Sequence, residues 1–428
     1  MAARAGIVVT GTEVLTGRVS DRNGPWLAEA LRAEGVDVGS VVVVGDRPED
    51  LRSALAFLAG SGVDLVITTG GLGPTADDLT AVVVGDFQGR PSAVDPALEA
   101  RIGAIVARLS ALRGWRMEPA ATAAGVTKQA QVPVGATVLE PVGTAPGLVV
   151  PVAEGRSGPP VLVLPGPPSE LQGMWPAALA AELVRTALAG ATELRQETLR
   201  LWGTPESELA ATLRRIDDQL RGLEVTTCLR DGELEIVTRY SPDAGPAYRL
   251  LQQAVTEDFG DMLFSQDGAT VDEQVAAALA GRAWTVAVGE SCTGGLLAAR
   301  LTAAPGSSAW ALGGVAAYAN SAKEQLLDVS VEMLAASGAV SPEVALAMAQ
   351  GARDRFGADV GVGVTGIAGP GGGTTGKPVG TVHLAAVGPD GTATKSVVLP
   401  GSRDAVRQRT TTLALHLLRG LLLGGPPA

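Results

Sequence analysis

The sequence predicts an α/β protein built in three parts. Near both ends of the chain, short apolar runs typical of buried strands alternate with stretches of helical periodicity. Between them, alternating runs flank a tight turn, which indicates a small α+β module. The length of 428 residues exceeds one ordinary domain. We therefore expect an α/β domain over residues 1–170, the module over 171–264 and a second α/β domain over 268–423.

Composition restricts the classes of function. Hydrophobic residues make up 46% of the chain and aromatic residues only 3%, so the cores must be built from Ala, Val and Leu. The 56 Gly and 27 Pro are spread among periodic segments, which indicates tight turns. The net charge of -12 argues against a broad nucleic-acid-binding face, because phosphate neutralisation needs a basic surface. We expect small-molecule partners and no direct nucleic-acid partner.

Few residues in the chain suit a transition metal. The two cysteines, Cys228 and Cys292, and the two histidines, His383 and His416, form no zinc-binding spacing. Any bound metal should therefore be a hard cation held by carboxylates. We find no signal-peptide pattern and no apolar stretch that would span a bilayer. The expectation is a cytoplasmic protein without membrane association.

The first domain follows a β-α-β-α-β pattern. Gly35 ends the first expected helix and Pro48 begins the second. This pattern predicts a parallel sheet with helices on its faces, in which ligands bind beyond the carboxyl ends of the strands. The expected strands cover residues 7–9, 36–44 and 64–69, and the expected helices cover 23–34 and 48–58.

A glycine-rich loop follows the third strand and reads Gly-Gly-Leu-Gly-Pro-Thr-Ala-Asp-Asp-Leu-Thr over residues 70–80. Gly70, Gly71 and Gly73 would let the backbone approach a phosphate, and a helix start would bind it. The two adjacent carboxylates imply a cation such as Mg²⁺ between them and the phosphate. Glu13 would reach the same rim. The alternative is a Gly-Pro turn with an Asp as helix N-cap.

This loop and several other strings resemble the N-terminal domain of the CinA family (competence/damage-inducible proteins), and less closely the molybdopterin-binding domain of molybdenum-cofactor biosynthesis proteins. The resemblance implies hydrolysis of ADP-ribose with Mg²⁺, Mn²⁺ or Co²⁺. Asp77 and Asp78 would hold the metal, and the loop glycines with Thr75 would hold the pyrophosphate. The sequence departs from the family pattern at residues 126–127 and 140–142. The further matching strings are 11–17, Asn23, 128–130, 143–147 and 164–170.

The middle segment indicates a small α+β module. Asp231-Gly232 between alternating runs is a strong hairpin signal, and Pro205 opens a helix. Within the family the module resembles a KH-type fold, but it lacks the glycine loop that clamps RNA. We expect a spacer or dimerisation element, and hence a homodimer. The expected strands cover 193–202, 224–229 and 233–239, and a second helix covers 246–255.

A polar turn at residues 289–295 organises the last segment. It follows an expected strand over 284–288 and precedes an expected helix over 296–301. Such a turn directs backbone N–H groups and the positive end of a helix dipole into one small space. Ser291 in this turn could attack a substrate beside donors for a developing oxyanion. The alternative is that it only caps the helix.

A serine nucleophile needs a general base. His383 alternates within a strand and His416 lies in the terminal helix, so neither is placed for this role. Tyr318 and Lys323 share one polar patch, and a desolvated lysine, its pKa lowered, could take the proton directly or through the tyrosine. A solvated helix lysine is the alternative reading of the patch. Cys292 is a rival nucleophile, although no histidine is placed to form its thiolate.

The last segment resembles the CinA C-terminal domain, the nicotinamide-mononucleotide amidohydrolase of PncC type. The resemblance implies hydrolysis of nicotinamide mononucleotide to nicotinic acid mononucleotide and ammonia, without a cofactor. It assigns Ser291 as nucleophile, with Tyr318 and Lys323 as acid and base. A further hypothesis is a binding protein for a phosphorylated cofactor, or an accessory to DNA uptake, without deamidase activity. The matching strings are 290–295, 318–323, 338–341, 365–370 and 377–380.

Other residues near this turn are expected to bind the substrate. We place the oxyanion hole at the backbone N–H groups around Thr293 and Gly294. Either the glycine loop at 369–373 or Arg407 would hold the 5′-phosphate, since an arginine makes bidentate contacts. The expected substrate-binding residues of this site are Thr293, Gly294, Thr365, Gly369, Gly371 and Arg407.

Overall fold

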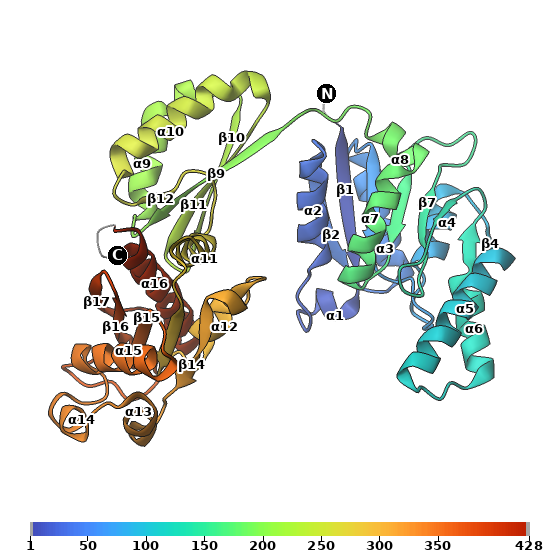
Figure 1. Ribbon diagram of the computed structural model, residues 1–428. Helices are drawn as coiled ribbons and strands as arrows, with labels where there is room; N and C mark the ends of the chain where they lie inside the picture. The colour runs from blue at the N-terminus through green and yellow to red at the C-terminus, as the bar shows by residue number, and fades with distance from the viewer. Residues whose placement is uncertain (1–2, 425–428) are drawn as a thin grey trace. The chain divides into compact units, whose positions relative to one another are not determined.

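The computed structural model describes residues 3–424. The chain divides into two compact units, with the boundary in the sequence between Leu194 and Arg195 (Figure 1). The first unit thus extends beyond the boundary expected at residue 170. The reason is that helices α7 (Pro168–Ala180) and α8 (Glu182–Ala187) complete its core, where Leu171 and Val184 are fully buried.

The first unit contains a six-stranded sheet in the order β2-β1-β3-β8-β7-β6. The first four strands in this order are parallel, and β7 and β6 are antiparallel to their neighbours. The expected parallel core is therefore present and is extended at one edge by a hairpin. The strands are β1 (Arg4–Thr10), β2 (Asp37–Val44), β3 (Leu65–Thr69), β6 (Thr137–Leu139), β7 (Gly147–Val150) and β8 (Val161–Leu164).

Helices cover both faces of this sheet. Ile7 and Val9 belong to the core under α2, α7 and α8, whereas Val8 belongs to the core on the other face, because strand side chains alternate. A short antiparallel pair joins β4 (Ser92–Val94) to β5 (Gln131–Pro133). The remaining helices are α1 (Thr12–Leu15), α2 (Asn23–Ala33), α3 (Pro48–Gly60), α4 (Thr80–Gln88), α5 (Pro96–Arg113) and α6 (Pro119–Gln129).

The second unit begins with the middle module, an antiparallel sheet in the order β10-β11-β9-β12. Asp231 (φ 52°) and Gly232 (φ 94°) make the predicted two-residue hairpin turn, in which both central residues need positive φ. The elements are β9 (Arg195–Trp202), α9 (Glu206–Ile216), η1 (Asp217–Gln219), β10 (Leu223–Arg230), β11 (Glu233–Tyr240), η2 (Pro242–Ala244), α10 (Gly245–Phe259) and β12 (Leu263–Ser265).

The C-terminal domain completes the second unit with a sheet in the order β14-β13-β15-β16-β17. Strand β13 is parallel to both its neighbours, whereas β16 is antiparallel to β15 and β17. The elements are α11 (Val271–Arg282), β13 (Val286–Glu290), α12 (Leu296–Leu301), η3 (Ser307–Ala309), β14 (Ala311–Ala316), α13 (Asn320–Leu327), α14 (Val331–Ser337), α15 (Pro342–Phe356), β15 (Val360–Gly366), β16 (Thr381–Gly388), β17 (Gly391–Val398) and α16 (Arg403–Leu423).

Glycines in β15 allow helix α15 to lie directly against the sheet. A Cβ added at Gly361 would be 2.0 Å from the Ala349 carbonyl oxygen, and one at Gly363 would be 2.0 Å from that of Ala345. No larger residue fits at either position without a backbone shift. Strand β15 pairs in parallel with β13, so the carboxyl ends of the two strands lie together where the polar turn begins. None of the helices within residues 3–424 combines the length and apolar character that a membrane crossing requires.

Candidate active site at Ser291 and a cleft in the first unit

Ser291 follows directly on β13, at the carboxyl edge of the sheet. Its backbone N–H donates to the Val364 carbonyl of the neighbouring strand at 2.9 Å. The first turn of α12 is capped instead by the buried carboxylate of Glu290, which accepts from the N–H groups of Gly295, Leu297 and Ala298. The Ser291 hydroxyl is therefore not used as a helix cap and is available for chemistry.

Lys323 contacts this hydroxyl from helix α13. Its side chain is 1% exposed, and its Nζ lies 3.2 Å from Ser291 Oγ. The same Nζ donates to the Ala317 carbonyl at 2.9 Å and to the Tyr318 carbonyl at 3.1 Å. Desolvation by burial lowers the pKa of Lys323 from that of a free lysine. The reading of Lys323 as a solvated helix lysine is thereby excluded.

These three contacts suit a neutral amine that acts as a base. A neutral amine has two N–H bonds and one lone pair, and the two carbonyls satisfy the two N–H bonds. As an ammonium, Nζ donates to all three oxygens, Ser291 Oγ included; in the neutral form its lone pair can instead accept the proton of the Ser291 hydroxyl. A direct transfer from serine to lysine is the proton path that this geometry favours.

Tyr318 lies near this pair, but its hydroxyl points to another partner. Its side chain is 64% exposed, and its hydroxyl accepts from Arg403 Nη2 at 3.2 Å. The contact between Lys323 and Ser291 is direct, so proton transfer does not require the tyrosine as an intermediate. The sequence reasoning did not place Arg403 in the site, although its position at the first turn of the terminal helix was visible.

Arg407 supports the turn rather than presenting a free guanidinium. Its Nε donates to the Cys292 carbonyl at 3.1 Å and its Nη2 donates to the Thr293 carbonyl at 2.8 Å. Two of its donors are therefore used on the backbone beside the nucleophile. In this conformation Arg407 is a positioning group. The arginine that lies beside the Gly369 loop is Arg403, which donates to the Gly369 carbonyl at 2.7 Å.

The expected oxyanion donors are only partly available. The Gly294 N–H already donates to the Ser291 carbonyl at 3.2 Å. The Cys292 and Thr293 amides have no backbone acceptor within residues 3–424. The buried Thr293 hydroxyl likewise finds no hydrogen-bond partner among the described residues. The amides without a backbone acceptor therefore belong to residues 292 and 293, one position earlier than expected, and both lie next to the Cys292 sulfur.

Cys292 is not suited to be the nucleophile. Burial raises the pKa of its thiol to about 11, so the reactive thiolate is scarce at neutral pH.

The remaining predicted substrate-binding residues are Thr365, Gly369 and Gly371. The Thr365 hydroxyl donates to the Ala339 carbonyl at 2.7 Å, and Gly371 is exposed. A Cβ at Gly369 would lie 2.6 Å from Val379 Cγ1, so this loop position requires glycine.

The first unit contains a cleft of about 760 Å³ at the carboxyl edge of its sheet. The structure brings together here all the N-terminal residues that the sequence singled out, as expected for a parallel sheet. Glu13 reaches the cleft from the short helix α1 rather than from the strand end. The predicted residues that line the cleft are Glu13, Asn23, Gly70, Gly71, Gly73, Thr75, Asp77 and Asp78.

Several of these side chains hold the cleft in shape. The Asn23 amide donates to Thr69 Oγ1 at 3.0 Å and to the Gly166 carbonyl at 2.7 Å, which joins the end of β3 to the loop after β8. The Thr75 hydroxyl contacts carboxylate oxygens of both Asp77 and Asp78. The hydrogen bond from Thr75 is the main reason that the pKa of Asp77 is lowered, so this carboxyl is ionised at neutral pH.

The two carboxylates fit a hard divalent cation. Magnesium is commonly held by one or two carboxylates together with waters and substrate phosphates. Within residues 3–424 no three His, Cys, Asp or Glu side chains are grouped to hold a metal by themselves. Asp77 and Asp78 would therefore share a cation with a bound phosphate rather than form a complete protein site.

Glu170 is a further cleft residue that the sequence reasoning did not select. It lies at the start of α7, and burial raises the pKa of its carboxyl. A Cβ at Gly143 would lie 2.1 Å from its Oε1, so the loop from residue 143 packs directly on the carboxyl. Its place at the end of the 164–170 string was the available signal.

The fold and these two sites define a protein with a molybdopterin-binding-like unit and a serine–lysine site in a separate α/β domain. Residues 268–422 match the family described as CinA C-terminal domain, and residues 6–185 match the one described as probable molybdopterin binding domain. The chain belongs to the CinA family.

CinA-like relatives cover nearly the whole chain. A CinA-like protein of Mycolicibacterium gilvum (strain PYR-GCK) is 58% identical over 99% of this chain and 100% of its own. A CinA-like protein of Mycobacterium tuberculosis (strain ATCC 25177 / H37Ra) is 52% identical over 100% of this chain and 99% of its own. Among solved structures, the competence/damage inducible protein CihA from Agrobacterium tumefaciens is 41% identical over 35% of this chain and 94% of its own, with a TM-score of 0.34.

Proposed function

We propose that this protein hydrolyses the amide of nicotinamide mononucleotide at Ser291, releasing ammonia and nicotinic acid mononucleotide. The observation that carries the proposal is the contact between a buried lysine and a serine hydroxyl at a strand-to-helix turn. The nicotinamide substrate is taken from the resemblance of residues 290–295 and 365–370 to the CinA C-terminal domain. No cofactor takes part in this reaction.

The proposed reaction has two halves. Lys323 Nζ takes the Ser291 proton while Oγ forms a bond to the carboxamide carbon, and the resulting ammonium returns the proton to the leaving nitrogen as the carbon–nitrogen bond breaks. Ammonia leaves and an ester on Ser291 remains. Water then attacks the ester, with Lys323 again taking and returning a proton. The amides of Cys292 and Thr293 are the donors that we assign to the oxyanion.

The test is ammonia release from nicotinamide mononucleotide by the whole protein, with and without EDTA. We expect release that EDTA does not change, and a loss of at least about a thousandfold in Ser291→Ala. Ser308→Ala is the matched control, because Ser308 is exposed in the same domain and the chemical change is the same. Ammonia release that survives Ser291→Ala would refute the nucleophile. Folded protein without any release would instead favour a cofactor-binding or competence-accessory role.

A second proposed activity is hydrolysis of ADP-ribose in the first unit, supported by the 760 Å³ cleft that joins the glycine loop to Asp77 and Asp78. A bound Mg²⁺, Mn²⁺ or Co²⁺ would neutralise charge on the pyrophosphate. AMP formation should depend on added metal and fall at least about a hundredfold in Asp78→Asn. Absence of AMP with every metal would contradict this proposal and leave the Ser291 proposal unaffected.

A further inference from the structure

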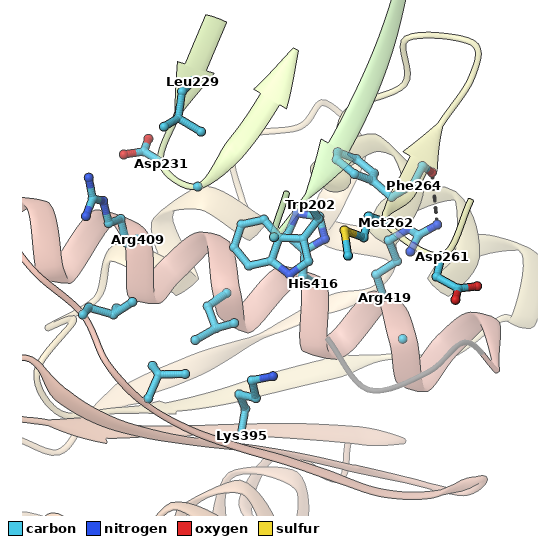
Figure 2. Close-up of a pocket in the computed structure, with 16 residues that line it drawn as sticks. Trp202, Leu229, Asp231, Asp261, Met262, Phe264, Lys395, Arg409, His416 and Arg419 are labelled. Carbon is cyan, nitrogen blue, oxygen red and sulfur yellow. Dashed lines mark hydrogen bonds between the residues drawn. The ribbon is translucent and has the colours of Figure 1, made fainter. Parts of the chain in front are cut away.

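The second unit contains a cavity of about 600 Å³ where the middle module meets the C-terminal domain. This volume lies within the range of small-molecule sites. Strands β9, β10 and β12 form one side, and β17 with α16 form the other (Figure 2). None of the residues that line it belongs to the Ser291 site, so it is a separate cavity.

One wall of the cavity is aromatic and firmly held. The Trp202 ring stacks on His416 with ring centroids 3.9 Å apart and planes at 13°, and Phe264 meets His416 edge-on. Glu233 fixes the imidazole through a contact of 2.7 Å to its Nε2. The wall therefore has a defined shape before any ligand binds, which lowers the cost of binding.

The hairpin turn of the module closes onto this wall. Gly232 has a φ of 94°, and a Cβ at this position would lie 3.0 Å from Trp202 Cζ3. Next to the turn, Leu229 is 53% exposed, and on the other side of the tryptophan Met262 is 43% exposed. These apolar side chains remain open to water at the cavity, and a ligand with an apolar body would cover them.

The charges around the cavity favour an anion. Arg409 donates to the Pro400 carbonyl, and Arg419 donates to the Phe264 carbonyl and the Gln274 side-chain oxygen, so the hydrogen-bond acceptors of both guanidinium groups there are uncharged oxygens. Lys395, on β17 across from Trp202 (Figure 2), has no hydrogen-bond or ion-pair partner within the described residues 3–424. Against these three cations the lining has two carboxylates, Asp231 and Asp261.

We propose that this cavity binds a small aromatic anion of mononucleotide size. The ring packs against the side chains of Trp202, Leu229 and Met262. The anionic group accepts a charge-assisted hydrogen bond from the Lys395 ammonium. Asp231 and Asp261 would repel further negative charge, so one anionic group is preferred over a diphosphate or triphosphate. The proposal does not depend on the activity proposed for Ser291.

The test uses AMP as the probe, with the full-length protein, by calorimetry and by hydrogen exchange. We expect binding in the micromolar to millimolar range and slower exchange in segments 229–232 and 395–399. Lys395→Glu should weaken binding at least tenfold. Arg355→Glu makes the same change in charge at an exposed position of the same domain and should leave binding unchanged. Adenosine and inorganic phosphate should each bind at least tenfold more weakly than AMP.

Three outcomes would overturn the proposal. These are no AMP binding to the unmodified protein at several millimolar, equal affinity in Lys395→Glu, or protection confined to the loop at residues 70–80 in the first unit. If the charge reversal prevents folding, Val397→Phe provides a second variant, because it fills the cavity from β17 without changing the charge. AMP binding that this variant leaves intact would equally exclude the cavity.

Discussion

Replacing Lys323 by methionine should slow ammonia release strongly without unfolding the protein. Methionine keeps a long apolar side chain but removes the amine that contacts Ser291 Oγ at 3.2 Å. Loss of a general base typically lowers a rate by about 10²–10⁴-fold, which corresponds to roughly 3–5 kcal/mol in the activation barrier. We expect kcat/KM for ammonia release to fall within this range.

The effect on stability should be smaller. The carbonyls of Ala317 and Tyr318 lose their donor, at about 1 kcal/mol each. The substitution also removes a buried amine whose charged form is disfavoured, and this offsets part of the loss. The free energy of unfolding should therefore fall by no more than about 2 kcal/mol, measured by urea denaturation.

The dependence on pH separates a catalytic base from a structural lysine. Only the neutral amine accepts a proton, so activity should rise as the pH rises through the lowered pKa of Lys323. The residual activity of Lys323→Met should lack this rise, and Ser291→Ala combined with Lys323→Met should be no slower than the slower of the two single variants. A loss of less than about tenfold, or an unchanged pH profile in the variant, would refute the assignment.

Three further predictions concern other parts of the chain. Cys292→Ala should keep ammonia release within about fivefold of the unmodified protein, since the thiol, with a pKa of about 11, is not the nucleophile; a loss as large as that of Ser291→Ala would contradict this. Gly363→Ala should lower the free energy of unfolding by about 3 kcal/mol, because its Cβ would overlap the Ala345 carbonyl, whereas Gly281→Ala, with open space around the added Cβ, should not destabilise the protein in urea denaturation. Burial lowers the pKa of His416, so the unfolded chain binds a proton that the folded chain does not, and the free energy of unfolding should fall as the pH drops below about 6.5. His416→Gln should lose this part of the pH dependence, and equal slopes in both proteins would show that another group titrates.

The sequence predicted the elements around each site well, because strand and helix periodicity and turn residues are local signals. The Asp231-Gly232 hairpin and the strand-to-helix turn at residues 289–295 were both confirmed. The pairing of Lys323 with Ser291 could not be predicted from such local signals. Serine and lysine are 32 residues apart, and only the packing of α13 beside β13 brings them to 3.2 Å.

Other features depended on contacts that no local pattern encodes. The expected extent of the first unit was short by α7 and α8, since their apolar faces could have packed on either neighbouring domain. Arg407 was predicted to bind the phosphate because an arginine can make bidentate contacts with a phosphate group, and the sequence does not show which other acceptors lie near it. Its actual partners are two backbone carbonyls more than a hundred residues earlier in the chain.

The surroundings of His416 determine where this protein can be divided. The imidazole belongs to the terminal helix, but Trp202, Glu233 and Phe264, which stack on it, bond to it and meet it edge-on, all come from the middle module. A fragment beginning at residue 268 would therefore expose to water a histidine that is 2% exposed in the whole chain. The smallest fragment that keeps this histidine enclosed begins at β9.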